Sequence, residues 1–234
     1  MTPQYKHALI IGAGFGLSAS LARLFTQNGL KVSLAARSVE KLGELASETG
    51  AATHACDAGD HAQVARLFQT LDQDGAPDVV VYNPSARVRG AFVELDPHAV
   101  QAAVQITAMG AFFAAQEAAK RMVPTNHGAV LFTGASAGVK GYPQSATFAM
   151  GKFAMRGLAQ SMARELHPLG VHIGHFVIDG GIRNAARPER MDGPDNPDSM
   201  LCPDAIARSY LHFLQQDRSS WAWEIELRPW VERF

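Results

Sequence analysis

The sequence predicts an α/β fold in which one doubly wound parallel sheet carries helices on both faces. Short apolar runs rich in branched residues alternate with longer amphipathic stretches, and a glycine-rich turn follows the first apolar run. Alternating strands and helices form a parallel sheet, because each right-handed crossover lays its helix on one face. At 234 residues we expect a single domain over residues 1–234.

The alternation continues along the whole chain. Strands are predicted at HALIIG, KVSLAA, AATHAC, DVVVY, GAVLFTG, VHIGHFVI and WEIEL, which are residues 7–12, 31–36, 51–56, 78–82, 128–134, 171–178 and 223–227. Helical periodicity predicts helices over 17–28, 39–48, 61–73, 97–122, 145–166 and 204–215. Asp96 supports one helix start independently, because its side chain is a good N-cap and Pro97 has no N–H group to leave unpaired. The segment 187–200, rich in proline and aspartate, is predicted to be a mobile loop.

Composition and charge narrow the class of partner. Hydrophobic residues make up 47% of the chain, and 21 basic side chains against 22 acidic ones favour neither nucleic acid nor an anionic membrane. No run reaches the roughly 18 apolar residues of a membrane span, and the N-terminus lacks the pattern of a secretory signal. We therefore expect a cytoplasmic protein with a small-molecule partner.

No metal site is predicted. Cys56 and Cys202 have neither metal-like nor redox-like spacing, and we expect both to be reduced. His172 and His175 are three residues apart on a predicted strand, which sends them to opposite faces of the sheet.

A glycine-rich turn joins the first strand to the first helix. The stretch IGAGFGLSAS has glycines at 12, 14 and 16 and a serine at 18, where a further glycine is often found. Such a turn lets backbone N–H groups and a helix N-terminus approach a diphosphate, and its place in a βαβ unit favours this function over a plain tight turn. We therefore expect a Rossmann-like dinucleotide site with these residues: Gly12, Gly14, Phe15, Gly16 and Leu17.

The end of the second strand bears on which dinucleotide is bound. The stretch VSLAARS has no acid where dinucleotide-binding folds hold the ribose hydroxyls of NAD, and Arg37 lies beside that place. An arginine there can clamp a 2′-phosphate, so we predict NADP in preference to NAD. The alternative is a solvated arginine that opens a helix.

From Ile10 to about Leu227 the chain resembles the short-chain dehydrogenase/reductase family. GAGFG at 12–16 is similar to the family's glycine loop, CDAGD at 56–60 to the segment after the third strand, and YNPSA at 82–86 to the Asn-Asn-Ala-Gly segment after the fourth. The resemblance implies further cofactor contacts at Asp57 and Ala58 beside the adenine, at Asn83 and Pro84, and at Ile182 beside the nicotinamide carboxamide. It also implies a homodimer or homotetramer built on the helices over 97–122 and 145–166.

The family's catalytic Ser, Tyr, Lys and Asn can be sought position by position. Lys152 is present, whereas the tyrosine position four residues earlier holds Phe148 and the serine position holds Ala135. With Gly110 as the anchor, the asparagine position holds Thr107. The resemblance therefore implies an atypical member without the tyrosine that donates a proton and the serine that steadies the substrate oxygen. For Lys152 it implies contact with the nicotinamide ribose, and the alternative is a surface lysine on a helix.

Other hydroxyl groups are candidates for the missing proton donor. Tyr142 lies between Ala135 and Phe148, and Ser136 and Ser145 are further candidates; the alternative for Tyr142 is a packing role in the pocket wall. We predict catalytic roles for Lys152, Tyr142 and Ser136, and a substrate pocket formed by Ala135, Tyr142 and Phe148.

Two functions are compatible with these residues. The first is an NADP(H)-dependent oxidoreductase that transfers hydride to or from a small apolar or aromatic carbonyl compound, imine or activated alkene. The alternative is a non-catalytic NADP-binding sensor or partner subunit. Loss of a general acid typically lowers the reaction rate by about 10²- to 10⁴-fold. The hydride itself is supplied or accepted by the cofactor, so turnover without this acid is still compatible with the residues present. Turnover of NADPH would distinguish the two functions.

Overall fold

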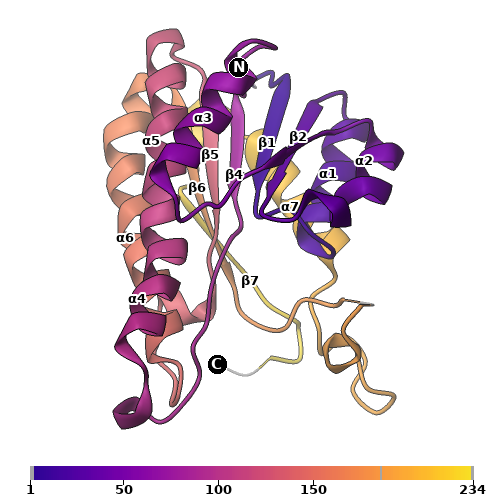
Figure 1. The fold of residues 1–234 in the computed structure, drawn as a ribbon. Helices are drawn as coiled ribbons and strands as arrows, with labels where there is room; N and C mark the ends of the chain where they lie inside the picture. Colours follow the sequence, from indigo (N-terminus) through magenta and orange to yellow (C-terminus); the bar gives the residue numbers. More distant parts are fainter. Residues whose placement is uncertain (1–2, 185, 233–234) are drawn as a thin grey trace.

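The computed structural model describes residues 3–184 and 186–232, which form a seven-stranded parallel sheet between two helical layers (Figure 1). The strand order is β3-β2-β1-β4-β5-β6-β7. The strands are β1 (His7–Ile11), β2 (Lys31–Ala36), β3 (Ala52–Ala55), β4 (Val79–Tyr82), β5 (Gly128–Thr133), β6 (Val171–Ile178) and β7 (Glu224–Leu227). The predicted doubly wound α/β fold is confirmed, with every strand within two residues of its expected bounds.

The central strands are apolar along their whole length because both of their faces are covered. Every residue of β1, β4, β5 and β6 is buried. A strand in the middle of a parallel sheet packs against helices on both faces, so it shows a continuous apolar run instead of an alternating pattern. This is why the short apolar runs located the strands well.

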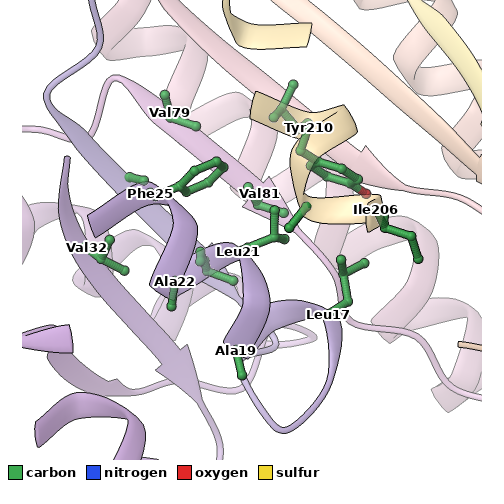
Figure 2. Packing of buried hydrophobic residues seen from close by; sticks show 14 of the residues in the cluster. Leu17, Ala19, Leu21, Ala22, Phe25, Val32, Val79, Val81, Ile206 and Tyr210 are labelled. Atoms are coloured by element: carbon green, nitrogen blue, oxygen red, sulfur yellow. The ribbon is translucent and has the colours of Figure 1, made fainter. Parts of the chain in front are cut away.

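Seven α-helices within the described residues form the two outer layers. They are α1 (Leu17–Gln27), α2 (Gly43–Thr49), α3 (His61–Asp72), α4 (Pro97–Val104), α5 (Gly110–Met122), α6 (Ala146–Leu166) and α7 (Pro203–Leu214). Helices α3 to α6 cover one face of the sheet, and α1, α2 and α7 cover the other (Figure 1). Figure 2 shows the second layer from close by, where Leu21 and Phe25 of α1 lie among Val79 and Val81 of β4 and Tyr210 of α7.

Two predicted helices are interrupted. The helix expected over 39–48 begins as a 3₁₀ turn, Val39–Leu42, before α2. The helix expected over 97–122 contains a π-helical turn, Gln105–Met109, between α4 and α5. Asp96 caps its start as predicted, since its carboxylate accepts hydrogen bonds from the backbone N–H groups of the next turn at 3.1 and 3.2 Å.

The π-helical turn has a tertiary cause. Tyr82 donates a hydrogen bond from its hydroxyl to the carbonyl oxygen of Ile106 at 2.5 Å, which gives a carbonyl at the bulge a partner outside the helix. Gly110 allows this approach, because a Cβ atom there would collide with the Tyr82 hydroxyl and the Ala58 carbonyl oxygen. The bulge therefore forms where β4 and the long helix touch.

The long helix also has an outward apolar face. The stretch Pro97–Thr125 is long and apolar enough to cross a membrane by length and composition alone, with a mean hydropathy of 1.2 in its most apolar window, of which 33% is buried. Ala111, Ala114 and Ala118 face the core, whereas Met109 and Phe112 are about two-fifths exposed. The sequence predicted no membrane span here, and the resemblance implied that this helix forms a subunit contact.

The two histidines of β6 lie on opposite faces, as predicted. His172 stacks on Phe213 of α7, with ring centroids 4.1 Å apart. His175 lies on the face of α6, where its Nδ1 atom is 2.9 Å from the carboxylate of Glu224, which also pairs with Arg156. Both rings are buried, and burial lowers the pKa of each to about 4. No group of three metal-ligating side chains occurs among the described residues.

Candidate active site

The candidate site lies where the sheet changes direction. From β1 the chain continues to β2 and β3 on one side of the sheet, and from β4 it continues to β5, β6 and β7 on the other side. The loops after β1 and β4 therefore run in opposite directions and leave a crevice at the carboxyl ends of these two strands. The excursion after β6, described for residues 179–184 and 186–202, lies beneath the same edge of the sheet (orange in Figure 1). It contains a 3₁₀ turn, Pro188–Arg190, and a bridge from Ile182 to Leu201.

The glycine loop has the backbone geometry that a bound diphosphate requires. Gly12 has a φ of +77°, a backbone conformation that favours glycine. A Cβ atom there would also lie 2.7 Å from the ring of Pro84, so both backbone strain and steric overlap exclude a larger residue. Gly16 precedes α1 without a side-chain cap, which leaves the first N–H groups of that helix available to an anion. Asn83 holds the turn, because its amide nitrogen donates to the hydroxyl of Ser18 at 2.8 Å, and that hydroxyl donates to the Gly12 carbonyl at 3.2 Å.

Three neighbouring cavities lie in this crevice, and two of them border the glycine loop. The first, here called the outer cavity, has a volume of about 440 Å³ and lies between the glycine loop and the ends of β2 and β3. Its lining includes these predicted residues: Gly12, Gly14, Phe15, Arg37, Asp57, Ala58, Asn83 and Pro84. Ser38 and Lys41 also line it, and sequence analysis missed both. Lys41 lies on the 3₁₀ turn after Arg37, a turn that the periodicity did not reveal.

The second, called the inner cavity, has a volume of about 480 Å³ and continues past the other side of the glycine loop. It is lined by predicted residues from four loops and from α6: Phe15, Gly16, Leu17, Asn83, Ala135, Phe148, Lys152 and Ile182. Its lining also contains four arginines and Lys152 but no aspartate or glutamate among the described residues. The inner cavity is therefore suited to an anion.

The third, called the side cavity, has a volume of about 440 Å³ and joins the inner cavity at a shared wall. Ala135, Ser136, Tyr142 and Phe148 line it, together with Arg87, Arg89 and Arg190. Every residue predicted to bind the cofactor, to line the substrate pocket or to donate a proton thus lines one of three neighbouring cavities, whereas Thr107 lines none of them. Their individual roles remain predictions.

Lys152 is the buried cation at the base of the inner cavity. Its ammonium group donates to the carbonyl oxygen of Thr133 at 2.6 Å, and only 2% of the residue is exposed. Burial, and to a smaller extent the positive charge of Arg87, lowers the pKa of Lys152 to about 7. The alternative of a surface lysine is therefore wrong.

Phe148 lies close to two cations, Lys152 and Arg87. The Lys152 nitrogen is 5.8 Å from the centroid of the Phe148 ring, and the guanidinium carbon of Arg87 is 3.7 Å from it. The ring contributes a cation-binding face and no hydrogen-bonding atom. Sequence analysis missed Arg87, whose only local signal is the pair of arginines in the run SARVRG directly after β4.

The hydroxyl group of Thr107 is engaged by the backbone instead of facing the cavities. The residue is buried in the π-helical turn, and its hydroxyl accepts a hydrogen bond from the Ala86 N–H group at 3.1 Å. Gly151 lets α6 approach this turn, because a Cβ atom there would come within 2.8 Å of the Thr107 side chain. Thr107 therefore links the loop after β4 to the long helix beside Lys152.

Comparison with known proteins identifies the family. The sequence profile of short chain dehydrogenases matches residues 6–189. The chain belongs to the short-chain dehydrogenase family. A 3alpha-hydroxysteroid dehydrogenase of Mediterraneibacter gnavus is 29% identical over 231 residues, which cover 92% of each chain. This short-chain dehydrogenase is therefore an oxidoreductase-family protein with an NAD(P)-binding Rossmann-like fold.

Solved structures agree with this assignment. A short-chain dehydrogenase from Rhodopseudomonas palustris is 30% identical and matches with a TM-score of 0.82 over 97% of this chain and 100% of that one. A metagenomic short-chain oxidoreductase in complex with NADP is 23% identical, with a TM-score of 0.83 over 99% of this chain and 100% of that one. The second comparison bears on the fold alone.

Proposed function

We propose that this short-chain dehydrogenase is an NADP(H)-dependent oxidoreductase that transfers hydride to or from a small carbonyl compound, imine or activated alkene. One observation carries the proposal: the outer and inner cavities meet at the glycine loop, and the inner cavity continues past Lys152 to the side cavity, which Phe148 and Tyr142 line. This order of cavities fits a dinucleotide whose nicotinamide end lies beside the substrate.

The residues present fit the cofactor. The uncapped start of α1 at Gly16 would hold the diphosphate, and the buried ammonium group of Lys152 would hold the nicotinamide ribose. Arg37 and Lys41 would meet a 2′-phosphate, because Asp57 is the one acid in the described lining of the outer cavity and its carboxylate already accepts from the Gly59 N–H group at 2.9 Å. When bound, the cofactor supplies or accepts the hydride.

The protonation step is unusual in this proposal. We infer that Phe148 and Ala135 occupy the family's tyrosine and serine positions, so neither supplies a hydroxyl group. Tyr142 is the proposed substitute, since it lines the side cavity with 42% of its surface exposed, and Lys140 lies beside it with its nitrogen 5.6 Å from the ring centroid. Ser136 lines the same cavity and is the second candidate.

The absence of these hydroxyls favours a second candidate function, a protein that binds NADP without turnover. The same glycine loop and buried lysine serve both functions, so binding alone does not distinguish them. A thermal-shift titration with NADP(H) and NAD(H), followed by a NADPH-oxidation screen over ketones, imines and activated alkenes, separates them. Turnover of any class supports the enzyme, whereas stabilisation by NADP without turnover supports the binding protein.

Replacing Arg37 tests the choice between the two dinucleotides. We expect Arg37→Gln to weaken NADP⁺ binding by about tenfold or more while NAD⁺ binding changes little, because a charge-assisted contact to the 2′-phosphate is lost. Isothermal titration calorimetry with both cofactors measures this directly. Arg208→Gln, at an exposed arginine of α7 away from the three cavities, is the control. Equal losses for NADP⁺ and NAD⁺ would contradict the assignment.

We also propose a homodimer or homotetramer that packs α5 and α6 against a second copy. Phe112 of α5 and Phe153 of α6 are 40% and 45% exposed, and Met109 and Met150 of the same two helical segments are exposed as well, at 42% and 53%. Several exposed apolar side chains on two helices are typical of an interaction surface. We expect Phe112→Glu with Phe153→Glu to raise the dissociation constant of the oligomer at least about 100-fold, as measured by light scattering after gel filtration. Phe92→Glu, at an exposed phenylalanine elsewhere, is the control. A native protein that elutes as a monomer would refute the proposal.

A further inference from the structure

Three arginines from two distant loops meet in the side cavity. Arg87 and Arg89 belong to the loop after β4, and Arg190 belongs to the 3₁₀ turn Pro188–Arg190 in the excursion after β6. Arg87 and Arg190 also line the inner cavity, whereas Arg89 lines the side cavity alone among the three. The trio therefore extends from the place beside Lys152 to the far wall of the proposed substrate pocket.

Unlike Arg183 of the inner cavity and the nearby Arg228, these arginines have no acidic partner within 4 Å among the described residues. Arg183 pairs with Asp192, and Arg228 pairs with Glu226. Within residues 3–184 and 186–232, the structure gives the trio no carboxylate within 4 Å, although Asp179 and Glu232 line the same cavity. Asp179 is engaged elsewhere, at 3.7 Å from Lys140 and 3.9 Å from Arg228.

Arg87 packs on an aromatic ring and lies close to the charges of the other two arginines. The Arg87 guanidinium lies flat enough on Phe148 to bring its carbon within 3.7 Å of the ring centroid. Burial lowers the pKa of Arg87, and the neighbouring charges of Arg190 and Arg89 lower it further. Like charges that line one cavity repel one another until an anion joins them, and guanidinium groups are the side chains best matched to carboxylate and phosphate oxygens.

We propose that the substrate carries an oxyanion, a carboxylate or a phosphate, which Arg87, Arg89 and Arg190 bind while the reacting group lies beside Lys152. The proposal rests on the proposed function, because it names the substrate class of that same site. It adds a charged group to the apolar or aromatic substrate expected from the sequence, whose ring or chain would lie against Phe148 and Tyr142. The phenylalanine ring thus orients an anchoring arginine.

The test compares three probes that share one ring and differ in their head group. The native protein, saturated with NADP⁺, is titrated calorimetrically with benzoate, phenyl phosphate and the neutral benzamide. We expect one of the anions to bind at least about tenfold more tightly than benzamide, and the preferred anion identifies the head group. Arg89→Gln should weaken that anion by about tenfold and leave benzamide and NADP⁺ unaffected. Arg190→Gln provides a second variant, and Arg208→Gln is the control.

Three outcomes would overturn the proposal. The first is that benzamide equals both anions in affinity, and the second is that Arg89→Gln and Arg190→Gln retain full anion affinity. The third is that NADP⁺ displaces the anion, which would assign the arginines to the cofactor's phosphates. The failure of the proposed function looks different. If NADP⁺ does not bind but benzoate binds in an Arg89-dependent way, the anion site stands and the cofactor assignment falls. If NADPH is oxidised only with neutral substrates, the enzyme stands and the anion site falls.

Discussion

Restoring two hydroxyl groups, with Phe148→Tyr and Ala135→Ser together, is expected to raise NADPH-dependent reduction of small ketones and aldehydes by at least about 100-fold. The Lys152 nitrogen is 5.8 Å from the centre of the Phe148 ring, so a phenol at this position would have an ammonium group nearby to favour its ionised form. Ala135 lies in the same wall of the inner and side cavities. The gain comes from a general acid and a hydroxyl donor that act as a unit, so their contributions are not additive.

Single variants and a misplaced phenol serve as controls for this gain. Phe148→Tyr alone should give part of the increase and Ala135→Ser alone little, since the serine steadies an oxygen that still lacks its acid. Phe92→Tyr adds a phenol at a residue that is 79% exposed and lines none of the three cavities, and it should change nothing. Loss of NADPH absorbance measures each rate. If the native chain already reduces ketones as fast as the double variant, the acid lies elsewhere, and Tyr142→Phe should then abolish the activity.

The fold was predictable because its signals are local. The buried strands of a parallel sheet are apolar throughout, and the turn after β1 needs glycine at position 12 whatever the rest of the chain does. The residues proposed to bind the cofactor lie in the same turn and at the ends of neighbouring strands. These positions depend on backbone geometry, which a short stretch of sequence largely determines.

The π-helical turn was not predictable from helical periodicity. It depends on the Tyr82 hydroxyl reaching Ile106 across 24 residues and on Gly110 making room for that contact. A sequence pattern records which residues favour a helix, but it does not record a partner that arrives from another element. The same limit applies to Lys41, whose place in the outer cavity depends on a 3₁₀ turn.

The arginine trio is the largest part of the site that the sequence concealed. Arg87 and Arg89 form an unremarkable pair after β4, and Arg190 lies in a segment identified only as a loop about 100 residues later. Their meeting depends on how the excursion after β6 folds back under the sheet edge. A net charge of −1 for the whole chain gives no hint of a locally cationic cavity.

Lys152→Met is expected to stabilise the cofactor-free protein near neutral pH, in contrast to its effect on NADP⁺ binding. The ammonium group is buried, and its pKa falls from the usual 10.5 to about 7. A charged lysine in this place opposes folding, and a shift of this size corresponds to an upper bound of about 5 kcal/mol. Methionine removes the charge but leaves the Thr133 carbonyl without its 2.6 Å donor, so we expect a net gain on the order of 2–3 kcal/mol in the free energy of unfolding.

The sign of the pH dependence distinguishes this cause from simple repacking. The pKa of Lys152 is lower in the folded state than in the unfolded chain, so between about pH 7 and about pH 10.5 the unfolded chain binds more protons than the folded one. The free energy of unfolding of the native protein therefore rises with pH across that window. The advantage of Lys152→Met should therefore be greatest at and below about pH 7 and should fade as the pH approaches 10.5. Urea unfolding at several pH values measures it, with Lys6→Met, at an exposed lysine before β1, as the control.

The same substitution should weaken NADP⁺ binding by about tenfold or more, since the ammonium group that would hold the ribose is gone. Opposite effects on stability and on cofactor affinity would mean that the buried charge is kept for the ligand at the expense of the free protein. A uniform stabilisation at every pH would instead indicate better packing by methionine. A loss of stability near pH 7 would mean that the hydrogen bond to Thr133 outweighs the burial of the charge.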